Sequence, residues 1–261
     1  MKVINSSPTF TSRNAYIRRA DDIVRHVRNE FPMFSPTLVF ENWKMFEAKN
    51  PSDFIHATKT IRKHIDIIED YRKITELSRD NPCFADIFEK VQQTKVGNCR
   101  EASTLTLATL FANDYRAIKI APMVEMHVID KNGQDVFVCH KFCDHSVVMA
   151  KMDKGNPEST KDVVILDTWA GKAMDYKEAL KEYKDRYMAR TYPQALLRTH
   201  KELIKEKGLF RALAIILDSK TTYKPKMAFG GSKEIEFSFE EGEKYGKMIA
   251  EKFPQVMMRE K

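Results

Sequence analysis

Up to about residue 90, apolar residues recur at the spacing of amphipathic helices. Six apolar positions near a 3.6-residue period predict a helix over 15–31: Ile17, Ala20, Ile23, Val24, Val27 and Phe31. The same period predicts helices near 37–46, over 53–79 and over 83–93. The inward face of the long helix is expected at Ile61, Ile65, Ile68, Tyr71 and Ile74. The polar residues 1–14 are expected to be irregular.

From residue 117 to 169 the pattern changes to short runs rich in β-branched residues, which predict strands. These runs are 118–123 and 124–129 (one strand with a break at Pro122, or two), 136–140, 145–150 and 163–169. Asn132-Gly133 indicates a hairpin turn. A buried helix is predicted over 99–112, and further helices over 175–190, 193–207 and 240–252, while 209–217 suits a helix or a strand equally.

This order of helices, antiparallel strands and helices is typical of an α+β fold rather than of alternating βαβ units. We therefore expect a central helix and an antiparallel sheet over residues 91–261, followed by C-terminal helices. Residues 1–90 are expected to form a helical N-terminal extension or subdomain.

Composition narrows the class of protein. The chain has 261 residues, 43% of them hydrophobic, and a net charge of +7, which excludes a long disordered chain. No apolar run long enough for a transmembrane helix occurs, and the N-terminus lacks a secretory signal. No RNA-binding or zinc-finger motif supports nucleic acid as a partner. The positive charge leaves an acidic partner or an anionic membrane surface open, and four cysteines favour a reducing compartment.

Three residues form a candidate catalytic set. Cys99 follows Gly97-Asn98 at the start of the predicted buried helix, where backbone N–H groups and the helix dipole stabilise a thiolate. His145 begins one predicted strand and Asp167 lies near the end of the next. If these strands pair antiparallel, His145 and Asp167 meet at one edge of the sheet, so that Asp167 can orient the imidazole.

Other arrangements compete with this set. Cys139, His140, Cys143 and His145 are potential zinc ligands, but their spacing is tighter than in usual zinc sites and no second pair occurs. We therefore expect no metal and no cofactor. Cys139 and Cys143 could also form a local disulfide, or either could replace Cys99 as the nucleophile. His127, two residues after Glu125, is an alternative base. The basic face near Arg62 and Lys63 could bind a membrane or a partner.

The order of these residues resembles the papain-like and transglutaminase-like superfamily, which places Cys on a central helix and His and Asp or Asn on successive strands. Gln93, six residues before Cys99, matches the spacing of the papain-like oxyanion glutamine, although Gln92 competes for that role. Asp167-Thr168-Trp169 is similar to the papain-like Asn-Ser-Trp, in which the tryptophan covers the His–Asn pair. Asp in place of Asn is the transglutaminase choice, and the papain signature around the cysteine is missing.

Three phrases, Gly-Asn-Cys-Arg-Glu, Asp-His-Ser-Val-Val and Leu-Asp-Thr-Trp-Ala-Gly, are also similar to secreted bacterial effector enzymes. This resemblance implies a glutamine deamidase or transglutaminase that modifies a host protein after export by a non-classical route, or otherwise a cytoplasmic enzyme. It implies Cys99 as nucleophile, His145 as general base and acid, Asp167 as orienting group and Trp169 as cover. A cysteine protease, and an inactive papain-like protein that binds through its basic helices, remain the alternatives.

Overall fold

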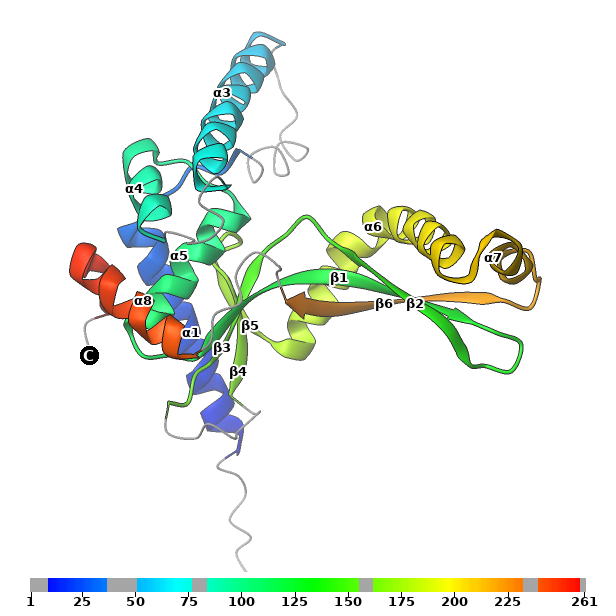
Figure 1. The fold of residues 1–261 in the computed structure, drawn as a ribbon. Helices are drawn as coiled ribbons and strands as arrows, with labels where there is room; N and C mark the ends of the chain where they lie inside the picture. The colour runs from blue at the N-terminus through cyan, green and yellow to red at the C-terminus, as the bar shows by residue number, and fades with distance from the viewer. Residues whose placement is uncertain (1–8, 37–50, 77–83, 155–161, 232–238, 259–261) are drawn as a thin grey trace, which may run out of the picture. The chain divides into compact units, whose positions relative to one another are not determined.

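The chain has an α+β fold, whose elements are labelled in Figure 1. The computed structural model describes residues 9–36, 51–76, 84–154, 162–231 and 239–258. Its helices are α1 (Thr9–Glu30), α3 (Pro51–Glu76), α4 (Phe84–Thr94), α5 (Cys99–Ala112), α6 (Tyr176–Lys207), α7 (Leu209–Ile216), α8 (Phe239–Lys252) and the 3₁₀ helix η1 (Pro254–Val256). Its strands are β1 (Ala117–Ile129), β2 (Asp135–Phe142), β3 (Val147–Lys151), β4 (Val163–Asp167), β5 (Lys172–Asp175) and β6 (Thr222–Gly231).

The elements divide into two units, each built from several segments of the chain. The first unit contains the chain up to Lys119, Ser146–Asp175 and the C-terminal helices α8 and η1. The second unit contains Ile120–His145 and the segment from α6 to β6. The prediction that the chain divides near residue 90 stays a prediction, while α1 and α5 belong to the same unit.

Helix α5 is the centre of the first unit. It packs against α1, α4 and α8, and against strands β3 and β4; Figure 1 shows α1 and α8 beside it. Every residue from Glu101 to Ala112 is buried. Burial on all sides favours apolar or internally bonded side chains on every face. Helix α5 supplies Ala, Leu, Phe, Ser and Thr, of which the buried Thr109 hydroxyl has no hydrogen-bond partner.

The sheet of the first unit is antiparallel, as the sequence pattern predicted. Strand β4 lies between β3 and β5, with Val148 opposite Leu166 and Leu166 also opposite Ala173. These three residues belong to one apolar core with residues of α1, α5 and α8. β1 begins in this unit, where the Lys151 N–H donates to the Arg116 carbonyl (2.9 Å). The core face of the sheet is therefore the face that α5 covers.

The second unit is a three-stranded antiparallel sheet with a long helix. β1 pairs with β2 on one side and with β6 on the other. Alternate β1 residues are buried from Pro122 to Val128, and α6 packs against β2 and β6. The buried residues of α6 repeat every four positions: Ala179, Tyr183, Tyr187, Thr191, Ala195, Thr199 and Leu203.

Several expectations from the sequence were wrong in detail. Helix α1 already begins at Thr9, inside the stretch expected to be irregular. β1 is one strand through Pro122, and α6 is one helix that contains Pro193 rather than two helices. On α3, Ile65 is 38% exposed while Ile68 is buried. The helix expected over 37–46 lies outside the described residues.

Two strands were missed, and the ambiguous segment is now assigned. Strand β5 has four residues and no β-branched side chain. Strand β6 contains Pro225 and ends in two glycines, which are weak strand formers; it pairs only with β1 among the described strands, so Pro225 lies on an edge. Residues 209–216 form the helix α7.

A buried ion pair fixes the start of α5. Glu101 is 2% exposed, and Arg72 of α3 donates to both of its carboxylate oxygens, at 2.8 and 2.9 Å. The same carboxylate accepts the Asn98 N–H at 2.9 Å. Paired and hydrogen-bonded in this way, the buried charge is tolerated; without its cation it would be strongly destabilising.

We expect Arg72→Met to lower the free energy of unfolding by about 3 kcal/mol, because it leaves the Glu101 carboxylate buried beside an apolar side chain. Urea unfolding of the full chain measures this loss. Arg25→Ala is the matched control, because Arg25 pairs with Asp22 on the surface, where a pair contributes about 1 kcal/mol at most. Equal losses in the two variants would contradict the role given to Arg72.

Helix α8 approaches the backbone of α5 at Gly246. A Cβ atom at this position would lie 2.4 Å from the Phe111 carbonyl oxygen and 2.8 Å from the Ala112 nitrogen. We expect Gly246→Ala to lower the free energy of unfolding by about 1–3 kcal/mol through overpacking, although alanine favours a helix. The exposed neighbour Lys247→Ala serves as control, and a Gly246→Ala protein as stable as this control would refute the close contact.

Candidate active site

Cys99 is the first residue of α5 and its side chain is partly exposed. The preceding residue, Asn98, caps the helix with an extended backbone (φ −116°, ψ −165°), and Glu101 accepts its N–H as described above. The predicted position of Cys99 at a helix N-terminus is therefore confirmed. Such a position places the backbone N–H groups of the first helical turn beside the sulfur, where they can stabilise a developing oxyanion.

The loop before Cys99 is held by the segment that follows α1. Phe34 and Val96 form a parallel bridge, in which the Phe34 N–H donates to Lys95 and the Gly97 N–H donates to Phe34. Gly97 is closely packed, since a Cβ atom there would lie 2.7 Å from the Met33 sulfur and 3.1 Å from Glu101 Cβ. A larger residue would therefore displace the flexible Met33 side chain and press on Glu101 in the first turn of α5.

One face of α5 carries Cys99, Ser103 and Thr106, which follow each other at helical spacing. The Ser103 hydroxyl lies 3.0 Å from the Ser146 hydroxyl, and the Thr106 hydroxyl lies 2.6 Å from that of Thr168. Ser146 and Thr168 belong to the first unit and directly follow His145 and Asp167 in the chain. These hydroxyl pairs, which the sequence analysis missed, fix this face of α5 against the chain beside both candidate residues.

Asp167 is the last residue of β4 and is fully buried. Its Oδ1 accepts the Ala170 N–H at 3.0 Å, and its carbonyl accepts the Gly171 N–H at 2.8 Å. The side chain therefore organises the turn between β4 and β5, which is the ordinary role of an aspartate at a strand end. A carboxylate has a second oxygen and further lone pairs, so this turn leaves it able to accept other hydrogen bonds.

Trp169 is connected to the start of α5 by two hydrogen bonds. Its indole N–H donates to the Ser35 hydroxyl at 2.7 Å, and that hydroxyl donates to Asn98 Oδ1 at 2.9 Å. The Ser35 hydroxyl thus links the buried indole to Asn98, the residue that directly precedes Cys99. The sequence did not predict this role of Ser35, because a serine before a proline indicates only a turn or the start of a helix.

His145 is the last residue of the second unit's first segment and precedes β3, which begins at Val147 rather than at His145. Its side chain is 4% exposed. The imidazole packs against two tyrosine rings of α6, with centroids 5.5 Å from Tyr183 and 5.6 Å from Tyr187. Cys99 and Asp167 belong to the first unit.

Gln93, the expected oxyanion residue, lies near the end of α4 with its side chain exposed. Its side-chain oxygen accepts a hydrogen bond from Lys90 at 3.4 Å. Gln92, which competes for the same role, is half-buried. The oxyanion role of Gln93 stays a prediction, and the backbone N–H of Cys99 is the donor whose position the start of α5 defines.

The other cysteines and histidines that we considered have different surroundings. Cys139 and Cys143 are buried free thiols, and burial raises the pKa of the Cys143 thiol. His127 lies between two carboxylates on β1 and β2, 2.7 Å from Glu125 and 3.0 Å from Asp135. Within the described ranges, no group of three or more His, Cys, Asp or Glu side chains is arranged to hold a metal ion.

The described helices include none that is long and apolar enough to cross a bilayer.

Three comparisons with known proteins were without a match. No family model matches the chain, and neither the curated proteins nor the solved structures searched give a match.

Proposed function

We propose that the protein is a thiol acyl-transfer enzyme with a papain-like or transglutaminase-like core. Cys99 is the nucleophile, His145 the general base and acid, and Asp167 the group that orients the imidazole. The substrate is an amide of another protein, and the reaction is deamidation or transglutamination of a glutamine side chain. The resemblance to secreted effectors supports a substrate in a host cell, reached by a non-classical route of secretion.

The observation that carries this proposal is the polar face of α5. Cys99 is the first residue of this face. The hydroxyls of Ser103 and Thr106, which follow on the same face, bond to those of Ser146 and Thr168. A buried helix that presents a partly exposed cysteine at its N-terminus, beside the chain that carries a histidine and a buried aspartate, has the parts that a thiol enzyme needs. The bonds from Trp169 through Ser35 to Asn98 support the covering role proposed for this tryptophan.

The proposed chemistry uses only these side chains and the substrate. The Cys99 thiol transfers its proton to His145, and the thiolate attacks the amide carbonyl carbon. The developing oxyanion is stabilised by the N–H groups at the start of α5. His145 returns the proton to the amide nitrogen, which leaves as ammonia when the substrate is glutamine. Attack on the resulting thioester by water gives glutamate, and attack by a lysine amine gives a crosslink.

Labelling with iodoacetamide tests the pairing of thiol and imidazole. We expect Cys99 to react faster than Cys83, Cys139 and Cys143, and His145→Gln to slow Cys99 by up to about thirtyfold, because a thiol without a base is only a few per cent ionised at neutral pH. Mass spectrometry of tryptic peptides gives each rate in the full chain.

The matched control is His127→Gln. It removes an imidazole of β1 that pairs with Glu125 of β1 and Asp135 of β2. Circular dichroism confirms that both variants are folded. If Cys99 reacts at the same rate in the wild type and in both histidine variants, exposure alone explains its reactivity and the proposed pairing is wrong.

The reaction itself is identified by comparing host lysate treated with the wild type and with Cys99→Ala. We expect deamidated or lysine-crosslinked glutamines only in the wild-type sample, because the variant lacks the attacking sulfur. New peptide termini that depend on Cys99 would instead identify a protease. Identical proteomes after the two treatments would overturn the enzyme proposal.

One observation favours a second function, that of a papain-like protein without catalysis. The Asp167 carboxylate stabilises its own turn through Ala170, so its burial has a structural explanation. Such a protein would act by binding, through basic surfaces, to an acidic partner. In that case Cys99→Ala would leave partner capture and the cellular effect unchanged, whereas the enzyme proposal expects the effect to be lost.

A further inference from the structure

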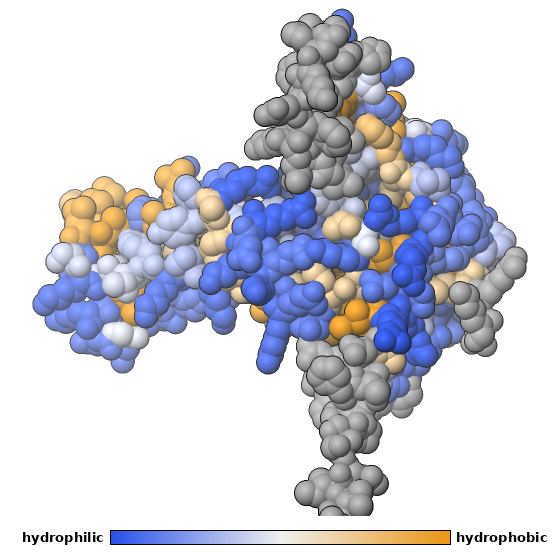
Figure 2. Space-filling view, turned by 180° about the vertical axis from the view of Figure 1, so that it is seen from behind, coloured by the Kyte–Doolittle hydropathy of each residue, from blue (hydrophilic) through white to orange (hydrophobic). Residues whose placement is uncertain are grey.

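Helix α7 in the second unit exposes an apolar face. Its inner side, which includes the buried Ala212, packs against α6. Its outer side carries Leu209, Phe210 and Leu213, followed by Leu217 at the C-cap. Phe210 is 87% exposed and Leu217 is 77% exposed. Figure 2 shows a patch of orange atoms on the part of the second unit that contains α7.

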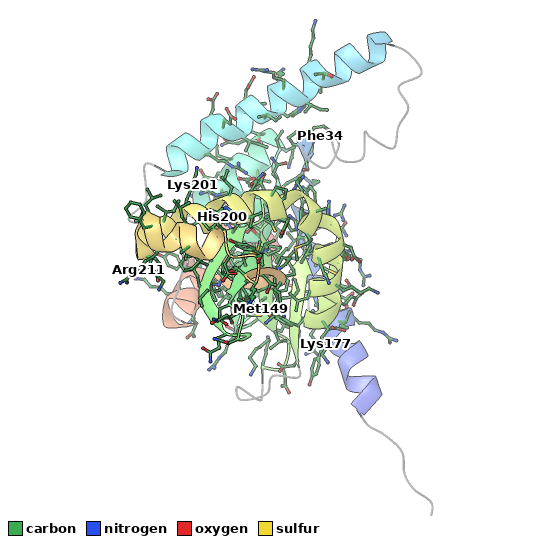
Figure 3. All side chains as sticks on the ribbon, turned by 90° about the vertical axis from the view of Figure 1, so that its right-hand side faces the viewer. Phe34, Met149, Lys177, His200, Lys201 and Arg211 are labelled. Carbon is green, nitrogen blue, oxygen red and sulfur yellow. The ribbon has the colours of Figure 1, made fainter. Side chains whose placement is uncertain are left out.

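Exposed cationic side chains lie on α7 and, along the chain, on either side of it. Lys201 and Lys205 on the last turns of α6, Arg211 on α7 and Lys220 just after α7 are all exposed. Figure 3 shows Arg211 extending outwards from α7, with Lys201 on the neighbouring helix α6. The nearby acidic groups are Glu202, Glu206, which pairs with Lys207 at 2.6 Å, and Asp218, which accepts the Lys220 backbone N–H. Cations therefore outnumber anions around the patch.

We propose that the outer face of α7 inserts into the interface of an anionic lipid bilayer. Its apolar side chains would enter the boundary between headgroups and acyl chains, and the surrounding lysine and arginine side chains would reach the anionic headgroups. A cationic rim around exposed apolar side chains has the charge that such a surface attracts. This inference is independent of the proposed function, because it uses no residue of the candidate active site.

The dimensions and charge of the patch argue against two other occupants, which are another protein and a second copy of this chain. α7 has 8 residues and is about 12 Å long, whereas a stable protein interface buries about 800 Å² on each partner. A second copy of the chain would also bring two cationic rims together, which is unfavourable. A bilayer accepts a short convex helix without a complementary groove, so it fits the patch better than either.

Sedimentation of the full chain with lipid vesicles tests the proposal. We expect binding to vesicles of phosphatidylserine and phosphatidylcholine that salt weakens, and little binding to phosphatidylcholine alone. Phe210→Ser/Leu217→Ser should lower the partition coefficient by about tenfold or more, because two large apolar side chains no longer enter the lipid. Arg211→Glu should lower it roughly fivefold or more.

The matched control is Met248→Ser/Met257→Ser, which removes two exposed apolar side chains from the first unit and should bind like the wild type. Circular dichroism checks the fold of each variant, and Arg211→Glu alone decides the test if the serine variant is unfolded. The proposal is overturned if the α7 variants bind as the wild type does, or if binding is equal on neutral vesicles. A dimer that Phe210→Ser/Leu217→Ser dissociates in gel filtration, or binding to polyglutamate without binding to vesicles, would also overturn it.

Discussion

The burial of α5 on every side is the constraint on which the rest of the first unit depends. Such burial keeps polar side chains from water, so most of those on α5 bond to groups inside the protein, and the buried Thr109 hydroxyl is the exception on this helix. Thr104 and Thr106 donate to backbone carbonyls one turn earlier, Glu101 binds Arg72, and the hydroxyls of Ser103 and Thr106 meet those of Ser146 and Thr168. These pairings set the depth and rotation of α5 against the sheet, and with them the position of its first residue.

The start of α5 is held by parts of the chain that lie far apart in sequence. Ser35 contacts Asn98 from the segment after α1, Arg72 reaches Glu101 from α3, and Trp169 binds Ser35 from the turn after β4. A cysteine fixed from three directions loses little further freedom when it attacks a substrate, which is the preorganisation that catalysis requires. The same rigidity also suits a binding protein, and the two functions differ only in whether the thiol reacts.

The sequence pattern predicted those features of the fold that depend on residues close together in the chain. The bounds of α5 and the hairpin after β1 followed from apolar spacing and from Asn132-Gly133, and the antiparallel pairing of β3 with β4 was also expected. Pro122 was overestimated as a break, because the pairing of β1 with β6 outweighs the loss of one N–H. The two helices expected over 175–190 and 193–207 are one helix that runs through Pro193. The contacts of Ser35 with Asn98 and of Arg72 with Glu101 could not be predicted, since nothing in the local sequence of either residue records a tertiary contact. The chemistry proposed for Cys99, His145 and Asp167 comes from their order in the chain and stays a proposal.

The packing of α8 along α5 has a consequence for the way the protein is made. α8 is the last long helix of the described chain, yet it covers a helix that is synthesised more than a hundred residues earlier. Until α8 emerges from the ribosome, the apolar side of α5 around Phe111 has no cover, because Gly242 and Gly246 are the residues that pack there. The first unit therefore completes its core only after α8 has been synthesised. Until then the nascent chain presents an apolar surface that chaperones can hold.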